Sequence, residues 1–474
     1  MTIKFGTDGW RAVISDTFTF ANLQLVAQAI ADYILEEAST DQPEVVVGFD
    51  TRFLSDRYAT EVARVLAGNG IIAWLTRADA PTPAVSYNVV HKKAVAGVMI
   101  TASHNAPRYN GVKLKAAYGG SASRQQGRMV ELFLERNQEQ ARGPNMIDYQ
   151  QGLDRGLIRR FDPAWAYYEH LGRLLDVDVI SAGELRVVAD SMYGSGRGCF
   201  REFLSRTRTR IREIRGEMNP GFGGIHPEPI ARYLTALVAA VQADQADVGL
   251  ATDGDADRMG VIDEKGSFVT QLQIFALLSL YLLEVRGERG PIVKTVTSTS
   301  MLYRLGELFK VPVYETTVGF KVVAPVMLAK DALIGGEESG GYGFRGHVAE
   351  RDGILASLYF LDLMVKTGKT PSQLVEYLYS KVGPHYYNRA DVKFPAEKRQ
   401  AIVERLRHKP PQSIEGVRVV KVDTADGFRF TLADTTWLLI RFSGTEPILR
   451  IYAETNSPER VERLLKFGRE LTGV

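Results

Sequence analysis

The feature that most restricts how this 474-residue chain can fold is a repeated alternation of short apolar runs with longer helical stretches. A β-branched run at Val45–Phe49 precedes a helical pattern over Tyr58–Ala67, and a second apolar run follows at Ile71–Leu75. Apolar runs of this length separated by helices are typical of βαβ units, whose strands are buried in a largely parallel sheet. Further strands are expected in the segments Leu185–Ala189, Val248–Thr252, Ile292–Val296 and Val311–Tyr314.

The order of elements changes near the end of the chain. Strand patterns follow one another at 417–422, 427–431, 437–442 and 449–454, and a helical pattern comes last at 458–471. Consecutive strands followed by a helix indicate an α+β unit. We therefore predict an α/β protein in which three similar α/β domains with mixed sheets precede a C-terminal α+β domain that acts as a lid.

The length also requires several domains, because a single hydrophobic core rarely grows beyond about 250 to 300 residues. Polar, turn-rich segments at 143–154, 263–266 and 382–387 are the expected joints. The predicted domains are residues 1–150, 151–263, 264–382 and 383–474.

Charge and composition exclude several classes of partner. Lys and Arg number 58 and Asp and Glu number 56, so the net charge of +2 produces no field that would attract nucleic acid or an anionic membrane surface. Cys199 is the only cysteine, which excludes an internal disulfide and a cysteine-based metal cluster. No apolar leader precedes Asp8, and the apolar stretch at Ile274–Leu283 is about half the length that crosses a bilayer. We therefore expect a buried helix there and a cytoplasmic protein.

The most informative segment is Ala246–Glu264, in which an apolar strand leads directly into Asp253, Asp255 and Asp257. On extended backbone, residues at i, i+2 and i+4 project to one side, so the three carboxylates are expected to converge. Their mutual repulsion calls for a hard cation, and a small set of oxygen ligands suits Mg²⁺. A plain turn is the structural alternative.

A calcium-binding EF-hand loop is a second alternative, because Glu264 is the twelfth residue counted from Asp253. Two features oppose it. Arg258 stands at the sixth position, where the sharp turn needs glycine, and the flanks 248–250 and 259–262 have strand patterns rather than helical ones.

A second segment, Val95–Lys115, places Ser103 in a loop of small residues directly after an apolar strand. The position suits a reactive hydroxyl, although a serine by itself is more often a turn or capping residue. A hydrolase pair with His104 is disfavoured, because adjacent residues on extended backbone point apart.

Two glycine-containing loops carry further candidate binding residues. In Leu333–Phe344, glycines that let the backbone approach a ligand surround Glu337, Glu338 and Ser339, and carboxylates and hydroxyls hydrogen-bond well to sugar hydroxyls.

In RFSGTEPILR, an arginine, two hydroxyls and N–H groups around a glycine form a phosphate cradle. The residues of that cradle are Arg441, Ser443, Gly444 and Thr445. Each loop alone is also compatible with a surface turn.

Taken in chain order, the segments FGTDGWRA, TASHN, DGDADR, GGEESGG and RFSGTEP closely resemble the signature segments of the α-D-phosphohexomutase family, which includes phosphoglucomutases and phosphomannomutases. The resemblance covers nearly the whole chain, and the four-domain phosphohexomutase architecture that it implies agrees with the fold predicted from periodicity. The chain departs from the family pattern at Ala106, where many members carry proline, and at Gly341, where several carry histidine.

The resemblance implies a role for each matching residue. Ser103 resembles the serine that carries the phosphoryl group, and Asp253, Asp255 and Asp257 resemble the Mg²⁺ ligands, with the phosphate on Ser103 completing the metal site. Lys113 resembles the general acid/base lysine. The residues implied to assist near the active serine are His104, Arg11 and Arg258. Those implied to bind substrate are Gly319, Lys321, Glu337, Ser339, Arg441, Ser443, Gly444 and Thr445.

The implied activity is an intramolecular phosphotransfer that interconverts hexose 1-phosphate and hexose 6-phosphate through a hexose 1,6-bisphosphate, with Mg²⁺ as metal and glucose 1,6-bisphosphate as activator. The GEESG form of the sugar loop resembles the phosphoglucomutase version, which favours glucose; mannose is a second expected substrate, and glucosamine phosphate is less expected. The alternatives are a glucose 1,6-bisphosphate synthase that uses a sugar bisphosphate donor and a non-catalytic sugar-phosphate-binding regulator. Hexose phosphates are the expected partners of a monomer or homodimer.

Overall fold

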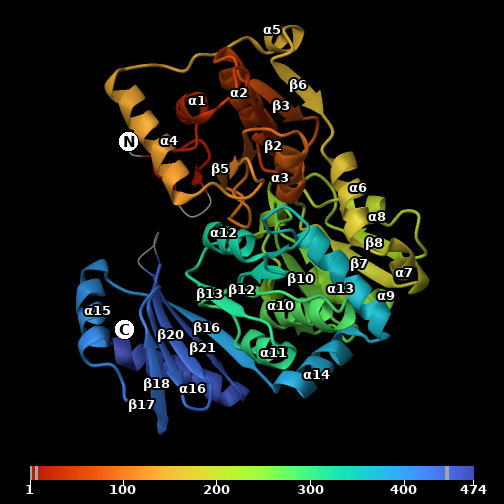
Figure 1. The fold of residues 1–474 in the computed structure, drawn as a ribbon, viewed down its shortest axis with the longest axis vertical. Helices are drawn as coiled ribbons and strands as arrows, with labels where there is room; N and C mark the ends of the chain where they lie inside the picture. The colour runs from red at the N-terminus through yellow and green to blue at the C-terminus, as the bar shows by residue number, and fades with distance from the viewer. Residues whose placement is uncertain (1–2, 6–8, 444–447, 474) are drawn as a thin grey trace.

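The structure is a computed structural model that describes residues 3–5, 9–443 and 448–473. It contains three successive α/β domains followed by an α+β domain, as the periodicity predicts (Figure 1). No helix among the described residues is long and apolar enough to span a membrane.

The first unit, domain I, is built on a six-stranded sheet in the order β1-β5-β4-β2-β3-β6. Its strands are β1 (Trp10–Val13), β2 (Glu44–Phe49), β3 (Ile72–Thr76), β4 (Ala96–Ile100), β5 (Tyr109–Ala116) and β6 (Ile158–Phe161). Strand β2 is parallel to β3 and β4, whereas β5 is antiparallel to β4 and to β1. Because β6 pairs in parallel with β3, this sheet extends past the expected boundary at residue 150.

Both faces of the first sheet are covered, which explains the continuous apolar run in β2. Val45 and Val47 pack in one cluster with three helices, whereas Val46 packs in a second cluster on the opposite face with a fourth helix. The three helices are α1 (Phe20–Glu37), α2 (Ser55–Gly68) and α4 (Arg124–Glu139), and the fourth is α3 (Thr82–His91). Burial on both sides fixes the ends of β2 and β4, where the loops of interest begin.

Domain II has a five-stranded sheet in the order β11-β10-β9-β7-β8, in which β7, β8 and β9 are parallel and β10 and β11 antiparallel. The strands are β7 (Arg186–Asp190), β8 (Arg210–Ile214), β9 (Val248–Thr252), β10 (Met259–Ile262) and β11 (Phe268–Val269). Its helices are α6 (Ala164–Leu174), α7 (Val177–Ala182), α8 (Cys199–Phe203) and α9 (Thr235–Asp244). Strand β11 lies past the expected boundary at residue 263.

Domain III is built on a four-stranded sheet in the order β13-β12-β14-β15. The strands are β12 (Ile292–Thr295), β13 (Val313–Thr316), β14 (Ile334–Gly336) and β15 (Tyr342–Phe344). The helices are α10 (Gln271–Leu280), which continues through a π-helical turn at Tyr281–Val285, and α11 (Met301–Phe309), α12 (Phe320–Lys330), α13 (Gly353–Thr367) and α14 (Pro371–Val382). The expected buried helix at 274–283 is therefore part of this domain.

Domain IV is an antiparallel sheet in the order β16-β21-β20-β19-β18-β17 with helices on it. The expected strands are present as β18 (Val417–Asp423), β19 (Phe428–Leu432), β20 (Trp437–Phe442) and β21 (Ile448–Thr455), and the expected helix as α16 (Pro458–Thr472). Three elements were not predicted: β16 (Tyr386–Lys393), α15 (Arg399–His408) and β17 (Ser413–Ile414).

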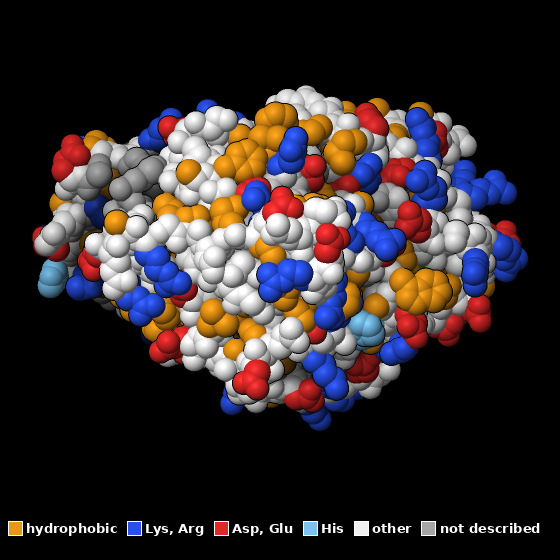
Figure 2. All heavy atoms as spheres, turned by 90° about the horizontal axis from the view of Figure 1, so that it is seen from above, with side chains coloured by type: hydrophobic (Ala, Val, Ile, Leu, Met, Phe, Trp, Pro, Cys, Tyr) orange, Lys and Arg blue, Asp and Glu red, His pale blue; other side chains and the backbone are white. Residues whose placement is uncertain are grey.

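The cores show which domains are tied together. One apolar cluster contains Leu250 of β9, Phe275 of α10 and Leu361 of α13, so domains II and III share a core. Domains I and IV have separate clusters of their own. In Figure 1 domain I stands above the shared II–III body and domain IV lies beside it. Basic and acidic side chains are interspersed on the face shown in Figure 2, in keeping with the small net charge.

Candidate active site

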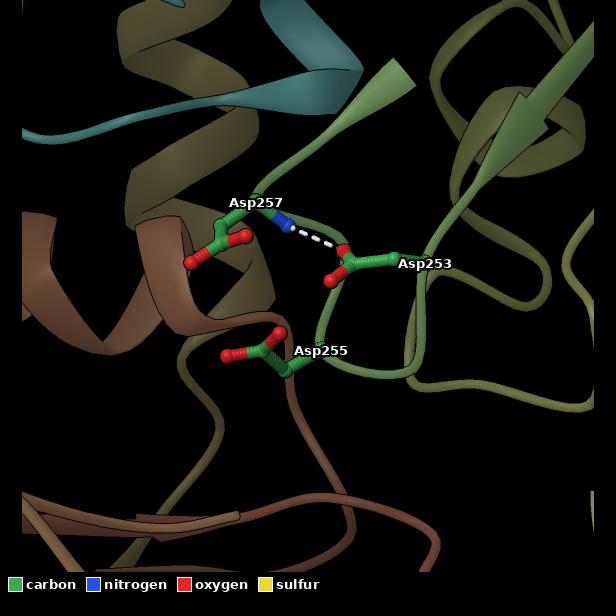
Figure 3. Close-up of side chains that lie close together, drawn as sticks. All are labelled: Asp253, Asp255 and Asp257. Carbon is green, nitrogen blue, oxygen red and sulfur yellow. Dashed lines mark hydrogen bonds between the residues drawn. The ribbon is translucent and has the colours of Figure 1, made fainter. Parts of the chain in front are cut away.

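The aspartate cluster lies in the turn between β9 and β10, and its three members are fully buried. One ligand oxygen from each of Asp253, Asp255 and Asp257 lies within 4.8 Å of the others (Figure 3). The backbone here is a tight turn rather than the expected extended strand: Ala256 has φ = 58°, and Asp253 Oδ1 accepts the backbone N–H groups of Asp257 at 3.0 Å and Arg258 at 3.2 Å. The turn, and not alternation along a strand, brings the carboxylates together.

The chemistry of the cluster fits a hard divalent cation. Asp255 Oδ1 and Asp257 Oδ1 are buried and accept no hydrogen bond from the described residues, so each has a lone pair left for a metal. Burial, together with the nearby Asp257 and Asp255 charges, raises the pKa of Asp253 well above its usual value. The flanks are strands, so the EF-hand alternative is wrong.

Ser103 stands in the loop after β4 and is fully buried against the aspartate turn. Its Oγ donates to Asp253 Oδ2 at 2.8 Å, across the boundary between domains I and II. Its φ of 53° is left-handed, so the expectation of extended backbone is wrong here too, and His104 Nδ1 lies 3.5 Å from Ser103 Oγ. Burial and then the charges of Arg258 and Arg11 lower the pKa of His104 well below its usual value, which keeps the imidazole neutral.

Lys113 extends from β5 into the same cluster, where its side chain is 2% exposed. The Nζ lies 2.7 Å from Asp255 Oδ2 and 3.0 Å from Asp257 Oδ2. Burial works to raise the pKa of Asp255, but Lys113 and a 2.5 Å hydrogen bond from Thr82 Oγ1 outweigh it and hold the pKa below its usual range. The hydroxyl, the three carboxylates and the ammonium therefore form one buried group.

Arg11 and Arg258, the two arginines expected near Ser103, lie at the edge of this buried group. Arg11 Nη1 donates to Asn105 Oδ1 at 2.8 Å, in the same loop as Ser103. Arg258 is buried, with its Nε 3.8 Å from Asp257 Oδ1. Arg258 thus contributes positive charge beside the carboxylates, and Arg11 contributes it beside the Ser103 loop.

Glu337 follows β14 and is connected to the aspartate turn by a residue that the sequence did not single out. Arg351 donates through Nη1 to Glu337 Oε2 at 3.0 Å and through Nη2 to Asp257 Oδ2 at 2.8 Å. Ser339 is half-buried in the same loop. A Cβ at Gly341 would lie 2.3 Å from Arg351 Cδ, so this arginine requires glycine at the position where several family members carry histidine.

The residues expected to hold the remote phosphate lie farther out. Lys321 and Arg441 line one cavity of about 510 Å³ between domains I, III and IV, and Gly319, with φ = 121°, precedes α12 beside it. Arg441 Nε lies 2.8 Å from Asp426 Oδ1, and Asp426 Oδ2 accepts the N–H of Val318 at 2.9 Å. Among the other cradle residues Ser443 is buried, whereas Gly444 and Thr445 lie outside the described residues.

Two further buried residues that the sequence did not single out support the site, namely Asp50 and Arg52, which directly follow β2. A usable signal was present: polar residues after β2 and after β4 leave neighbouring parallel strands at the same edge of a sheet. Arg351 had no such signal, because it lies in a different loop from its partners Glu337 and Asp257, which are 14 and 94 residues away.

Comparison with known proteins gives matches along most of the chain. Four family models match: phosphoglucomutase/phosphomannomutase alpha/beta/alpha domains I (residues 2–141), II (165–266) and III (271–382) and the C-terminal domain (392–470). A phosphoglucomutase/phosphomannomutase of Thermococcus kodakarensis is 31% identical over 98% of both chains. A protein of the same organism described as a "probable phosphoglucosamine mutase" is 30% identical over 98% of this chain and 97% of its own.

Solved structures give the same picture. The crystal structure of a "putative phosphomannomutase" from Thermus thermophilus superposes with a TM-score of 0.86 at 36% identity, covering all of both chains. The open form of a Paramecium phosphoglucomutase, parafusin, shares the fold with a TM-score of 0.85 at 21% identity, covering 99% of this chain and 94% of its own. With all four domain models in order along the chain, the protein belongs to the phosphoglucomutase/phosphomannomutase family of α-D-phosphohexomutases.

Proposed function

We propose that this protein interconverts hexose 1-phosphate and hexose 6-phosphate through a phosphoserine at Ser103 and a hexose 1,6-bisphosphate, with glucose as the main sugar. The observation that carries the proposal is the 2.8 Å contact of Ser103 Oγ with Asp253, inside a buried group that also holds Lys113. A hydroxyl meeting carboxylates and an ammonium in a water-poor space suits phosphoryl transfer, in which positioning and charge stabilisation do most of the work.

In the forward step the bond between phosphorus and Ser103 Oγ breaks and a bond forms to a hydroxyl of the bound hexose monophosphate. Lys113 acts in this step as the neutral amine, after its ammonium has given up a proton: Nζ takes the proton of the attacking hydroxyl and becomes an ammonium again. The resulting bisphosphate then turns over so that its other phosphate faces Ser103. Transfer back to Ser103 releases the isomeric monophosphate, with Lys113 returning the proton. Mg²⁺ held by Asp253, Asp255 and Asp257 would offset negative charge on the phosphoryl group.

The remote phosphate is proposed to bind at Lys321 and Arg441, where the reaction makes and breaks no bond. These two cations line a cavity that receives side chains from three domains. A cradle of this kind recognises only the phosphate, so it accepts either end of the bisphosphate. Glu337 and Ser339 of the sugar loop are proposed to bind sugar hydroxyls.

Intact mass spectrometry tests the covalent step. We expect purified protein treated with glucose 1,6-bisphosphate to carry one phosphate, and Ser103→Ala to carry none. A phosphate that persists in Ser103→Ala, on a different residue, would contradict the proposal.

Side-by-side assays of glucose, mannose and glucosamine 1-phosphates test the sugar, with Mg²⁺ and trace bisphosphate supplied. Glucose 1-phosphate is expected to give the highest kcat/KM. Preference for glucosamine 1-phosphate would overturn the sugar assignment and place the chain with its phosphoglucosamine mutase relatives. Net accumulation of glucose 1,6-bisphosphate from glucose 6-phosphate and a sugar bisphosphate donor would indicate a synthase. If no hexose phosphate is turned over at all, the protein would be a sugar-phosphate-binding protein.

A further inference from the structure

Arg52 is a buried arginine, 2% exposed, whose guanidinium points at backbone carbonyls of the Ser103 loop instead of at the aspartates. Nη1 donates to the carbonyls of Ala106 and Tyr109, both at 2.9 Å. Nη2 donates to the carbonyls of Ser103 and Asn105, both at 2.6 Å. One side chain therefore holds the loop at its start and at its end.

The guanidinium is itself held in place by Asp50. Asp50 Oδ2 lies 3.2 Å from Arg52 Nε and accepts the hydroxyl of Thr101 at 2.6 Å. The same hydroxyl accepts the N–H of Ser103 at 2.8 Å. The polar residues that follow β2 thus form a rigid template for the backbone on both sides of Ser103.

Ser103 needs such a template because its backbone is strained. A non-glycine residue at φ = 53° is uncommon and persists where its surroundings fix it. Its carbonyl is confined on both sides, by Arg52 Nη2 at 2.6 Å and by Gly254, where an added Cβ would lie 2.5 Å from the Ser103 oxygen. With the carbonyl fixed, the hydroxyl faces Asp253.

We propose that Arg52 is a positioning residue for phosphoryl transfer: it locks the Ser103 loop so that Oγ faces the carboxylate cluster. The inference rests on the proposed role of Ser103. Arg52 does not touch the reacting group, and its part is to keep the strained loop in one geometry while phosphate is gained and lost. A lysine cannot replace it, because an ammonium offers donors from a single point and cannot reach carbonyls at both ends of the loop.

The decisive variant is Arg52→Lys, with Arg64→Lys as matched control. Arg64 is also an arginine of domain I that donates to a backbone carbonyl, from Nε to Ile147 at 3.1 Å, but away from the site. We expect Arg52→Lys to lower kcat for glucose 1-phosphate roughly 10- to 100-fold, the loss that a displacement of about 1 Å causes, while KM stays within about twofold. Arg64→Lys should keep both constants within about twofold of wild type.

A second variant separates positioning from general destabilisation. In Arg52→Ala, added guanidinium is expected to restore part of kcat, and added ammonium is not. A wild-type kcat in Arg52→Lys, or a loss confined to KM, would overturn the proposal.

Hydrogen–deuterium exchange keeps this inference distinguishable from the proposed function. Amides of residues 101–109 should exchange faster in Arg52→Lys than in wild type and Arg64→Lys, with α1 and α2 unchanged. If wild-type Ser103 takes up no phosphate but the loop exchanges faster, the phosphoserine proposal fails and the loop-locking role stands. If wild-type protein turns over and Arg52→Lys matches it in exchange and in kcat, the function stands and the role of Arg52 is refuted.

Discussion

The two ends of the proposed site are built in different ways. At the end where chemistry is proposed, Ser103, Lys113 and the three aspartates are buried and bonded to one another across domains I and II. At the phosphate-anchor end, Arg441 and its partner Asp426 keep 16% and 20% of their side-chain surface exposed and face an open cavity. Charge interactions are stronger where water is excluded, so the first end is preformed and the second depends on where domain IV sits.

The attachment of domain IV explains that dependence. Domains II and III share an apolar core, whereas domain IV has its own and meets domain III through a small apolar cluster around Val296 and Trp437 and through several polar contacts. Arg429 pairs with Glu315 of β13, and Glu454 accepts hydrogen bonds from Thr299 and Ser300 before α11. A small, mixed junction between separately cored domains allows relative movement, which suits an anchor that must admit and release substrate.

The largest effect is expected at the buried end, from Ser103→Ala. Removing the hydroxyl that carries the phosphoryl group should lower kcat by about 10⁴-fold or more, because the remaining groups cannot form the phosphoserine. Steady-state assays check this, with the exposed serine in Ser380→Ala as control. Activity within tenfold of wild type would show that chemistry does not pass through this hydroxyl.

Asp255→Asn should come next. It removes one of three converging carboxylates and the partner of Lys113, so we expect kcat to fall about 10²- to 10³-fold and Mg²⁺ affinity to drop. Titration calorimetry with Mg²⁺, together with assays after treatment with a chelator, measures both. Unchanged Mg²⁺ binding would remove the cluster from consideration as the metal site.

Arg441→Gln acts at the exposed end and should show a different signature. Loss of one charge-assisted bond worth about 1.5 to 3 kcal/mol predicts a KM roughly 10- to 100-fold higher, with kcat nearly preserved. Comparing KM and kcat with those of Asp255→Asn sharpens the contrast between the two ends. A fall in kcat with an unchanged KM would erase that contrast.

Glu454→Gln weakens the junction of domain IV without touching either end. We expect a KM increase of only a few-fold, from a larger share of molecules with the anchor displaced, and a larger radius of gyration in solution scattering. Identical scattering and kinetics would indicate that the junction does not control the anchor.

The smallest effect is a pH dependence at the same junction. Burial, then the charge of Arg429, lowers the pKa of Lys294 from its ordinary value of 10.5 to about 8 in the folded protein. Between pH 8 and 10.5 the unfolded chain therefore binds more protons at this residue, so its contribution to stability rises with pH. Over this pH window, the total change in Tm of Lys294→Met should differ from that of wild type by at most a few degrees. A slope that matches wild type would show that Lys294 keeps an ordinary pKa.

Strands could be predicted where their own residues show a clear apolar pattern, and could not be predicted where their place depends on distant partners. Strands β9 and β20 have the predicted bounds, because short apolar runs reveal buried strands directly. Strand β16 was missed because it is a largely exposed edge strand that pairs only with β21, so polar residues fill most of it. Strand β6 was not predicted, and its place in the first sheet depends on β3, which lies far away in sequence.

For this protein the sequence alone determined the types of element, the family and the chemical groups available, since periodicity and motif composition are carried by neighbouring residues. The tertiary structure alone decided that Ser103 meets Asp253, that Arg52 holds the Ser103 loop, and that Arg351 joins the sugar loop to the aspartate turn. The physical reason is that these contacts depend on the backbone conformation of the turns at Ser103 and Ala256 and on how separate domains pack. Local periodicity determines neither of these.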